Sequence, residues 1–397
     1  MIENKNPAAG KYPIAAAAFG VMIAGAFIPS PLYDLYRRDW GLSPAEISIV
    51  FAVYAGSLIP ALLFLGGISD NVGRRKTLLV ALAIWALASI VFAFASGLWW
   101  LLAARALQGV AMGIGAGTAV AAIREWMDES LRPLAGVVAL IGVSTGSALG
   151  ALIGGALGQY APHPTTLPYL VHIVLLACVA GAVATVPSCP HLAPAAHHGL
   201  PSIDPAIRRP FFLASTVSFI GWAASGIFVS LLPSFLIQSL SLHTLMVGAF
   251  VVTGLQIGML SALFIGRGLA TRAALITAML ALGGGIWMLL VAVPYHAYAL
   301  IALATLIVGI GGGLSNLAGL NIVNAIAPPD RRAETISAFL VAGYLGFSIP
   351  ALGVGIAANH VGLYAAIVGA AVIVGVVAVA TMLSTTDRNL KAVPART

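Results

Sequence analysis

The sequence contains very little charge. Only 8% of its 397 residues are Asp, Glu, Lys or Arg, while 60% are hydrophobic and the mean hydropathy is +1.02. A soluble domain carries about 25% charged and about 45–50% apolar residues, so the composition excludes a soluble globular protein. The long apolar runs also lack the alternation of a membrane-spanning β-barrel. The composition therefore predicts an all-α integral membrane protein.

Cysteine is also scarce. The two cysteines, Cys178 and Cys189, are too few for a disulfide framework or a cysteine-based metal cluster. The sequence has no G-x-x-x-x-G-K-[ST] loop for ATP and no H-E-x-x-H zinc motif. We therefore expect that the protein is not an enzyme and that it binds no cofactor and no metal. The net charge of +7 comes from cations scattered between apolar segments, which indicates membrane topology and no nucleic-acid partner.

Apolar segments long enough to cross a bilayer fill the chain. A helix needs roughly 20 residues to span about 30 Å of hydrocarbon, and twelve segments qualify. They lie near residues 12–35, 45–67, 77–97, 99–123, 133–158, 167–187, 210–233, 244–265, 272–293, 297–326, 333–357 and 362–383. We read the first as an uncleaved span and not as a signal peptide.

One long connection divides these spans. It is rich in Pro and His, which predicts a first six-helix half at 1–187, a cytoplasmic linker at 188–209, and a second half with a short cytoplasmic tail at 210–397. The string MGIGAG at Met112–Gly117 recurs as VGIGGG at Val308–Gly313. This repeat predicts two pseudo-symmetric halves around a central cavity, one of the known transporter plans.

The basic residues predict the orientation. With the N-terminus inside, sixteen of the 19 Lys and Arg lie on the cytoplasmic side, Arg37 and Arg38 lie outside, and Arg105 lies within a span. Cytoplasmic loops carry an excess of Lys and Arg. We therefore expect both termini in the cytoplasm and a bacterial plasma (inner) membrane location.

A charged stretch, GGISDNVGRRKTL, joins the second and third spans. It resembles the G-x-x-x-D-x-x-G-R-R-K signature of the major facilitator superfamily, with matching residues Gly66, Asp70, Gly73, Arg74, Arg75 and Lys76. The resemblance implies that superfamily's fold and a conformational latch in which Asp70 and Arg74 bridge to the start of span eleven. Simple anchoring at the cytoplasmic face explains Arg75 and Lys76 equally well, but gives no reason for Asp70.

Arg105 is the one basic residue well inside a predicted span, in the string RALQG. An intramembrane charge is costly, so it is a functional hypothesis by default. The string resembles the R-x-x-Q-G motif of proton-coupled exporters in the same superfamily, which implies that Arg105 and Gln108 take part in proton coupling. The alternative is that Arg105 lies about 8–9 Å below the Trp99–Trp100 interface and snorkels outward.

The fifth span carries a row of glycines: Gly142, Gly146, Gly150 and Gly154, followed by Gly155. Glycines at four-residue spacing share a helix face and allow close helix packing. The segment 150–155 also resembles the G-P-x-x-G-G motif of the antiporter branch, although Ala151 stands where that motif has Pro.

Few other polar residues lie within the spans. Asp34 is a second proton-coupling candidate, although Arg37 and Arg38 make a surface ion pair an equal alternative. Glu46 fits a capping box with Ser43.

Polar groups in lipid turn towards partners or a water-filled cavity. The substrate cavity candidates are therefore Trp222, Gln256, Asn316, Asn321 and Tyr344, with His172 and Asn324 as further intramembrane polar residues.

These features predict a secondary active transporter. The leading interpretation is proton-coupled export of a small organic or drug-like solute by alternating access, by a monomer whose partners are the solute, protons and the lipid bilayer. One alternative is an organic-anion carrier, a uniporter or symporter, with Arg105 as the substrate counter-ion. A more distant one is a non-transporting membrane sensor.

Overall fold

The computed structural model describes residues 8–187, 203–328 and 331–384, and these are almost entirely α-helical. Twelve helical segments are long and apolar enough to cross a membrane. The predicted all-α membrane fold with twelve spans is confirmed. Predicted and observed spans differ mainly at their ends. α5 begins earlier than predicted, at Arg74, and α6 ends later, at Glu125, so both continue into charged sequence.

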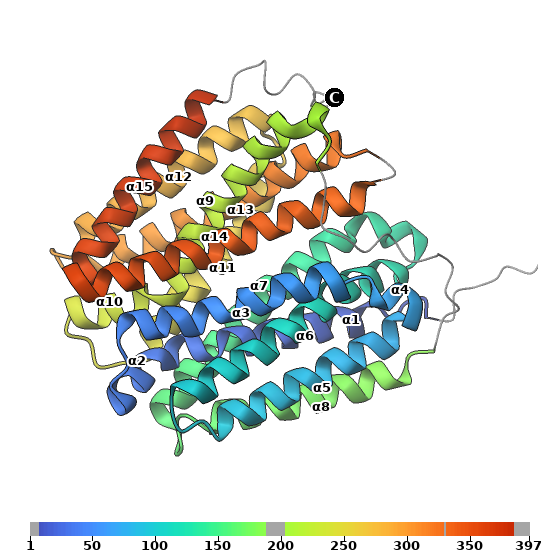
Figure 1. The fold of residues 1–397 in the computed structure, drawn as a ribbon, viewed down its shortest axis with the longest axis horizontal. Helices are drawn as coiled ribbons and strands as arrows, with labels where there is room; N and C mark the ends of the chain where they lie inside the picture. Colours follow the sequence, from blue (N-terminus) through green and yellow to red (C-terminus); the bar gives the residue numbers. More distant parts are fainter. Residues whose placement is uncertain (1–7, 188–202, 329–330, 385–397) are drawn as a thin grey trace, which may run out of the picture. The chain divides into compact units, whose positions relative to one another are not determined.

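Figure 1 shows the order of the helices. The segments before the central connection are α1 Tyr12–Phe27, α2 Pro29–Trp40, α3 Pro44–Leu65, α4 Ile68–Val72, α5 Arg74–Ala93, α6 Leu98–Glu125, α7 Ala135–Tyr160 and α8 Leu167–Thr185. Those after it are α9 Arg208–Ser230, α10 Leu232–Ser239, α11 Met246–Gly266, α12 Thr271–Ala292, α13 Tyr298–Ile326, α14 Arg332–Val361 and α15 Leu363–Ser384. Short 3₁₀ turns at Glu129–Leu134 and Pro205–Ile207 precede α7 and α9.

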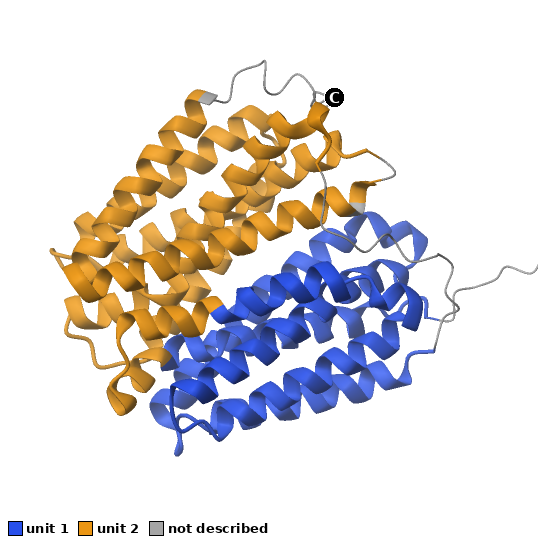
Figure 2. Ribbon diagram, viewed as in Figure 1, with its two compact units in different colours: residues 1–32, 53–199 blue, residues 33–52, 200–397 orange. Residues whose placement is uncertain are grey.

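The chain forms two compact units (Figure 2). Unit 1 comprises residues 1–32 and 53–199, and unit 2 comprises residues 33–52 and 200–397. Residues 33–52, predicted within the first half, thus cluster with the second. Inside unit 2 the Phe51 ring lies 4.7 Å from the Phe347 ring, and the Ala45 N–H donates to Asn359 Oδ1 at 3.4 Å. Most of the predicted linker, residues 188–202, lies outside the described residues.

The first span is interrupted, although its hydropathy predicts one continuous helix. α1 ends at Phe27 and α2 begins at Pro29. Proline has no N–H, so Pro29 cannot donate the helical hydrogen bond to the carbonyl four residues earlier. A corresponding break separates α9 from α10 at Leu231, two residues before Pro233.

The start of α3 has the predicted capping box. The Ser43 N–H donates to Glu46 Oε2 at 2.8 Å, and the Glu46 N–H donates to Ser43 Oγ at 3.2 Å. These reciprocal bonds satisfy two of the N–H groups that a helix start leaves without partners. Glu46 is therefore accounted for by helix geometry.

Candidate functional site

Arg105 lies on α6 in the interior of unit 1, and the residue is only 2% exposed. Its Nη1 donates to the Ala26 carbonyl at 3.0 Å and to Gln108 Oε1 at 2.8 Å. The guanidinium carbon also lies 5.7 Å from the Tyr54 ring centre and 6.0 Å from that of Phe92, within cation–π range. The side chain is held inward by these contacts, in contrast to the snorkelling arrangement.

The break after α1 explains why these contacts are possible. Gly25 would normally receive a hydrogen bond from the N–H of residue 29, which is proline. Gln108 Nε2 supplies the missing donor, at 3.0 Å from the Gly25 carbonyl. The negative end of the α1 dipole also favours the nearby guanidinium cation. Arg105, Gln108 and the last turn of α1 therefore form one unit, which we call the α1-end cluster.

The contacts of Arg105 and Gln108 with α1 go to the main-chain carbonyls of Ala26 and Gly25, which no side-chain motif reveals. The available signal was the pair Pro29 and Pro31 in the first span, which marks a helix break and hence carbonyls without helical donors.

The glycine row of α7 packs against the same helix. A Cβ built on Gly146, Gly150 or Gly154 would overlap the carbonyl oxygen of Gly20, Ala24 or Ile28 respectively. Gly142 makes a looser contact, since a Cβ built there would lie 3.5 Å from the Ala16 carbonyl oxygen, and Gly155 is buried. Backbone-to-backbone packing thus fixes the position of α1 along several turns.

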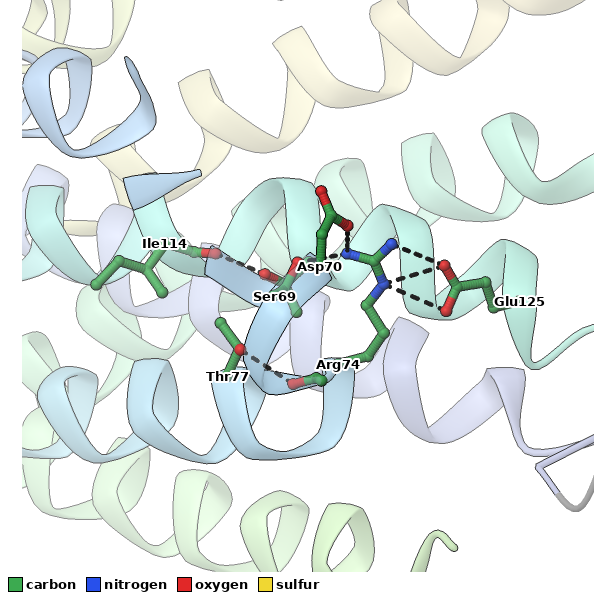
Figure 3. A network of polar contacts seen from close by, with 8 residues as sticks. Ser69, Asp70, Arg74, Thr77, Ile114 and Glu125 are labelled. Carbon is green, nitrogen blue, oxygen red and sulfur yellow. Dashed lines mark hydrogen bonds and ion pairs between the residues drawn. The ribbon is translucent and has the colours of Figure 1, made fainter. Parts of the chain in front are cut away.

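The charged loop forms a polar network on unit 1 (Figure 3). Arg74 Nη1 lies 2.5 Å from Asp70 Oδ1 and donates to Ser69 Oγ. Its Nη2 and Nε donate to Glu125 Oε1 at 2.8 and 3.0 Å. A two-point guanidinium–carboxylate contact is geometrically specific as well as attractive. Glu125, at the end of α6, was not predicted as a site residue.

Glycine is required within this loop. Gly73 has a φ of 98°, in the region that side chains other than glycine rarely adopt, and it separates α4 from α5. Gly66 lies just after α3, and its N–H donates to the Leu62 carbonyl at 3.2 Å. Arg75 is half-buried beside Arg74. The predicted bridge from Asp70 and Arg74 to the start of span eleven stays a prediction.

Asp34 lies on α2, within unit 2, and is 5% exposed. Its Oδ2 is 2.6 Å from Arg38 Nη2, and its Oδ1 is 3.9 Å from Arg37 Nη1. The carboxylate is buried, whereas the Arg38 side chain is 56% exposed. The ion pair considered from the sequence therefore exists, but its acidic member is inside the protein.

The cavity candidates all lie in unit 2. The Trp222 ring on α9 lies 5.3 Å from the Tyr344 ring and 5.6 Å from the Phe347 ring, both on α14. Gln256 on α11 and Asn316 on α13 each have a buried side-chain oxygen without a hydrogen-bond partner among the described residues. Asn321 lies five residues beyond Asn316, which turns it about 140° around the helix.

Among the described residues no group of three His, Cys, Asp or Glu side chains lies close enough to hold a metal ion. Cys178 is a free thiol on the exposed surface of α8. Cys189 lies outside the described residues.

Comparison with known proteins gives a family match over most of the chain. The model for the Major Facilitator Superfamily matches residues 15–351. The chain is 33% identical to multidrug resistance protein D of Escherichia coli strain K12 over 140 residues, 35% of each chain. It is 30% identical to the gallate transporter of Pseudomonas putida over 135 residues, 34% of this chain and 29% of that one. These matches span about a third of each relative's length.

Solved structures match the fold over the whole chain. A bacterial homologue of the human lysosomal transporter Spinster, in an inward-facing and unoccupied conformation, aligns with a TM-score of 0.75. The alignment covers 99% of this chain and 100% of the other, at 15% identity. At this identity the similarity establishes the fold alone.

Proposed function

The chain belongs to the Major Facilitator Superfamily, and from this premise we propose that it is a proton-coupled transporter that exports a small organic or drug-like solute by alternating access. It is a multi-pass integral membrane protein of a transporter family and not an enzyme. The proton coupling, the direction of transport and the solute class are the proposal.

The observation that carries the proposal is the buried guanidinium of Arg105. A charge inside a membrane span costs several kcal/mol even by the lowest estimates, about 2.5–3.5 kcal/mol for Arg on insertion scales. Here it is held at a helix break by Gln108 and the Ala26 carbonyl. A movement of α1 would change these contacts and hence the electrostatic potential inside unit 1, which is the kind of change that coupling to proton movement requires.

Asp34 is the second proposed proton-coupling residue. It is a buried carboxylate on α2 that pairs with Arg38 on the same helix. We propose that a proton is taken up and released at this side chain. Gln108 assists by fixing the orientation of Arg105.

A second solute class also has support. Gallate is a carboxylate, and one relative is named as its transporter. The buried Arg105 suits such an anion as a counter-ion, because a planar guanidinium group can donate two hydrogen bonds to one carboxylate. In this second candidate function, Arg105 binds the substrate directly and no proton exchange is needed.

The remaining assignments belong to the same proposal. We place both termini in the cytoplasm, because most Lys and Arg lie at one predicted face. The protein is proposed to be a monomer in a bacterial inner membrane. Asp70, Arg74 and Arg75, with Gly66 and Gly73, form the conformational latch. The solute cavity is lined by Trp222, Gln256, Asn316, Asn321 and Tyr344.

The test is reconstitution in liposomes that contain a pH-sensitive dye. Gallate and ethidium are offered as probe solutes to wild type, Arg105→Ala, Arg105→Lys and Asp34→Asn. Arg124→Ala is the matched control, since Arg124 is exposed near the end of the same helix. We expect solute-dependent proton movement in wild type and in the control, and its loss in Arg105→Ala and Asp34→Asn.

The outcomes separate the two candidate functions. Gallate uptake without proton movement, abolished by Arg105→Ala and retained in Asp34→Asn, favours the anion carrier. Solute movement without proton movement that is unchanged in every variant contradicts both mechanisms.

A further inference from the structure

A completely buried histidine lies beside the α1-end cluster and has no role in the function proposed so far. His172 on α8 is 0% exposed. Its Nε2 lies 2.9 Å from the Val21 carbonyl on α1, and its Nδ1 lies 2.8 Å from Ser89 Oγ on α5. The imidazole therefore joins three helices of unit 1 through two hydrogen bonds.

The hydrogen-bond partners of His172 limit where its ring can carry hydrogens. A carbonyl only accepts, so Nε2 carries the hydrogen that is donated to Val21. The Ser89 hydroxyl has one hydrogen, which reaches Nδ1 at 2.8 Å or the Trp85 carbonyl at 3.1 Å. A neutral imidazole with its hydrogen on Nε2 accepts from Ser89 at Nδ1. A charged ring would instead donate from Nδ1 to Ser89, whose hydroxyl would then donate to Trp85.

The surrounding helices give no support for a charged ring. α1, α5, α7 and α8 contain no Asp or Glu within their bounds. The titratable or charged residues they carry are Tyr12 on α1, Arg74, Arg75 and Lys76 at the start of α5, Tyr160 on α7, and Tyr169 and Cys178 on α8, while Arg105 projects from α6. None is an anion at neutral pH. An imidazolium here loses its hydration and gains no carboxylate partner.

The ring also packs directly on the α1-end cluster. A Cβ built on Gly25 would lie 2.8 Å from His172 Nε2 and 2.8 Å from Trp85, with the His172 Cε1 atom nearer still. Only glycine fits beneath the ring. The carbonyl of this same residue accepts the hydrogen bond from Gln108. The His172 ring therefore packs against the Cα of Gly25, while Gln108 donates a hydrogen bond to the Gly25 carbonyl.

We propose that His172 is a positioning residue for transport: as a neutral Nε2–H donor oriented by Ser89, it fixes the last turns of α1 so that the Gly25 and Ala26 carbonyls meet Gln108 and Arg105. The inference rests on the proposed role of Arg105 in transport. It does not make His172 a proton carrier.

The geometry selects the test variants. In His172→Gln the side-chain amide reaches the position of Nε2 and donates to Val21, so we expect solute transport within about threefold of wild type. His172→Leu has no donor, and we expect a loss of about tenfold or more, since a buried carbonyl is left without its partner. Ser89→Ala is the milder variant, expected to be intermediate. His243→Leu, on an exposed loop, is the control.

Two measurements distinguish positioning from other roles. The ratio of protons to solute, measured with gallate and ethidium in the dye-loaded liposomes, is expected to be the same in His172→Gln as in wild type. NMR of ¹⁵N-histidine protein is expected to show one neutral Nε2–H ring between pH 5 and 8 that disappears in His172→Gln. A titrating ring, or solute movement without protons in His172→Gln alone, overturns the proposal.

A third measurement needs no transported solute. Melting temperatures of His172→Leu, Gln108→Ala and the double variant form a thermodynamic cycle. We expect the double variant to lose less stability than the sum of the single variants, because both residues hold Gly25. Strict additivity overturns the inference. If wild type moves neither probe, the proposed function fails while the cycle and the NMR spectra still decide the role of His172.

Discussion

The contact between α7 and α1 gives a prediction that links packing to transport. Gly150 lies against the backbone of Ala24. The next residue, Gly25, accepts a hydrogen bond from Gln108 through its carbonyl. We consider Gly150→Ala, which adds a single methyl group and, by helix propensity alone, favours the helix by about 0.5–1 kcal/mol. Any loss of stability therefore comes from the helix–helix contact.

The size of the effect follows from the distances. The added Cβ would lie 2.7 Å from the Ala24 Cα, with the carbonyl oxygen nearer still. Ordinary contacts between such carbon atoms begin near 3.5 Å, so the two helices must separate by roughly 0.8 Å or more. Overpacking of a well-packed interior typically costs about 1–3 kcal/mol. We expect the upper part of that range, because the obstacle is backbone and not a flexible side chain.

The assay is thermal unfolding of purified protein together with liposome transport of gallate or ethidium. Gly150→Ala is expected to lower the melting temperature and to reduce transport more than stability alone explains, because it displaces the carbonyls that Gln108 and Arg105 hold. Gly136→Ala, on the same helix, and Gly181→Ala, on α8, are controls, since a Cβ on either meets nothing within 4 Å. A Gly150→Ala protein with wild-type melting and transport refutes the packing argument.

Two further predictions concern other parts of the chain. Ser43→Ala removes the side-chain cap of α3 and should lower the free energy of unfolding by about 1 kcal/mol, measured by thermal or denaturant unfolding; no change would show that the cap does not contribute. Glu125→Gln removes the negative charge that faces Arg74 but keeps one acceptor oxygen. Because Glu125 is 48% exposed, the cost should stay below about 1 kcal/mol and shrink as salt is raised. A cost that does not depend on salt would contradict this account.

Much of the fold followed from the sequence because membrane insertion imposes a simple rule. Each span must be apolar over about 20 residues and must satisfy its own backbone hydrogen bonds. That rule located the twelve spans. It did not predict that α1 stops at Phe27, because a hydropathy pattern averages over a break that two prolines introduce within one continuous apolar segment.

The candidate site was accessible to sequence reasoning only in part. Arg105 was conspicuous as a cation within an apolar segment, and Asp70 and Arg74 as charges in a short loop. Glu125 was less evident, because its contact with Arg74 joins residues 51 positions apart. His172 was noted only as a polar residue, since its significance depends on Val21 and Ser89, which lie on two other helices.

The contribution of α1 to the cluster is made by main-chain atoms. Val21, Gly25 and Ala26 each supply a carbonyl oxygen, to His172, Gln108 and Arg105 respectively. An alanine scan leaves the Val21 oxygen in place and does not change Ala26, which is already alanine, so these two positions score as dispensable while the helix itself is not. Backbone chemistry, such as an amide-to-ester exchange that weakens a chosen carbonyl as an acceptor, is the kind of change that reaches them.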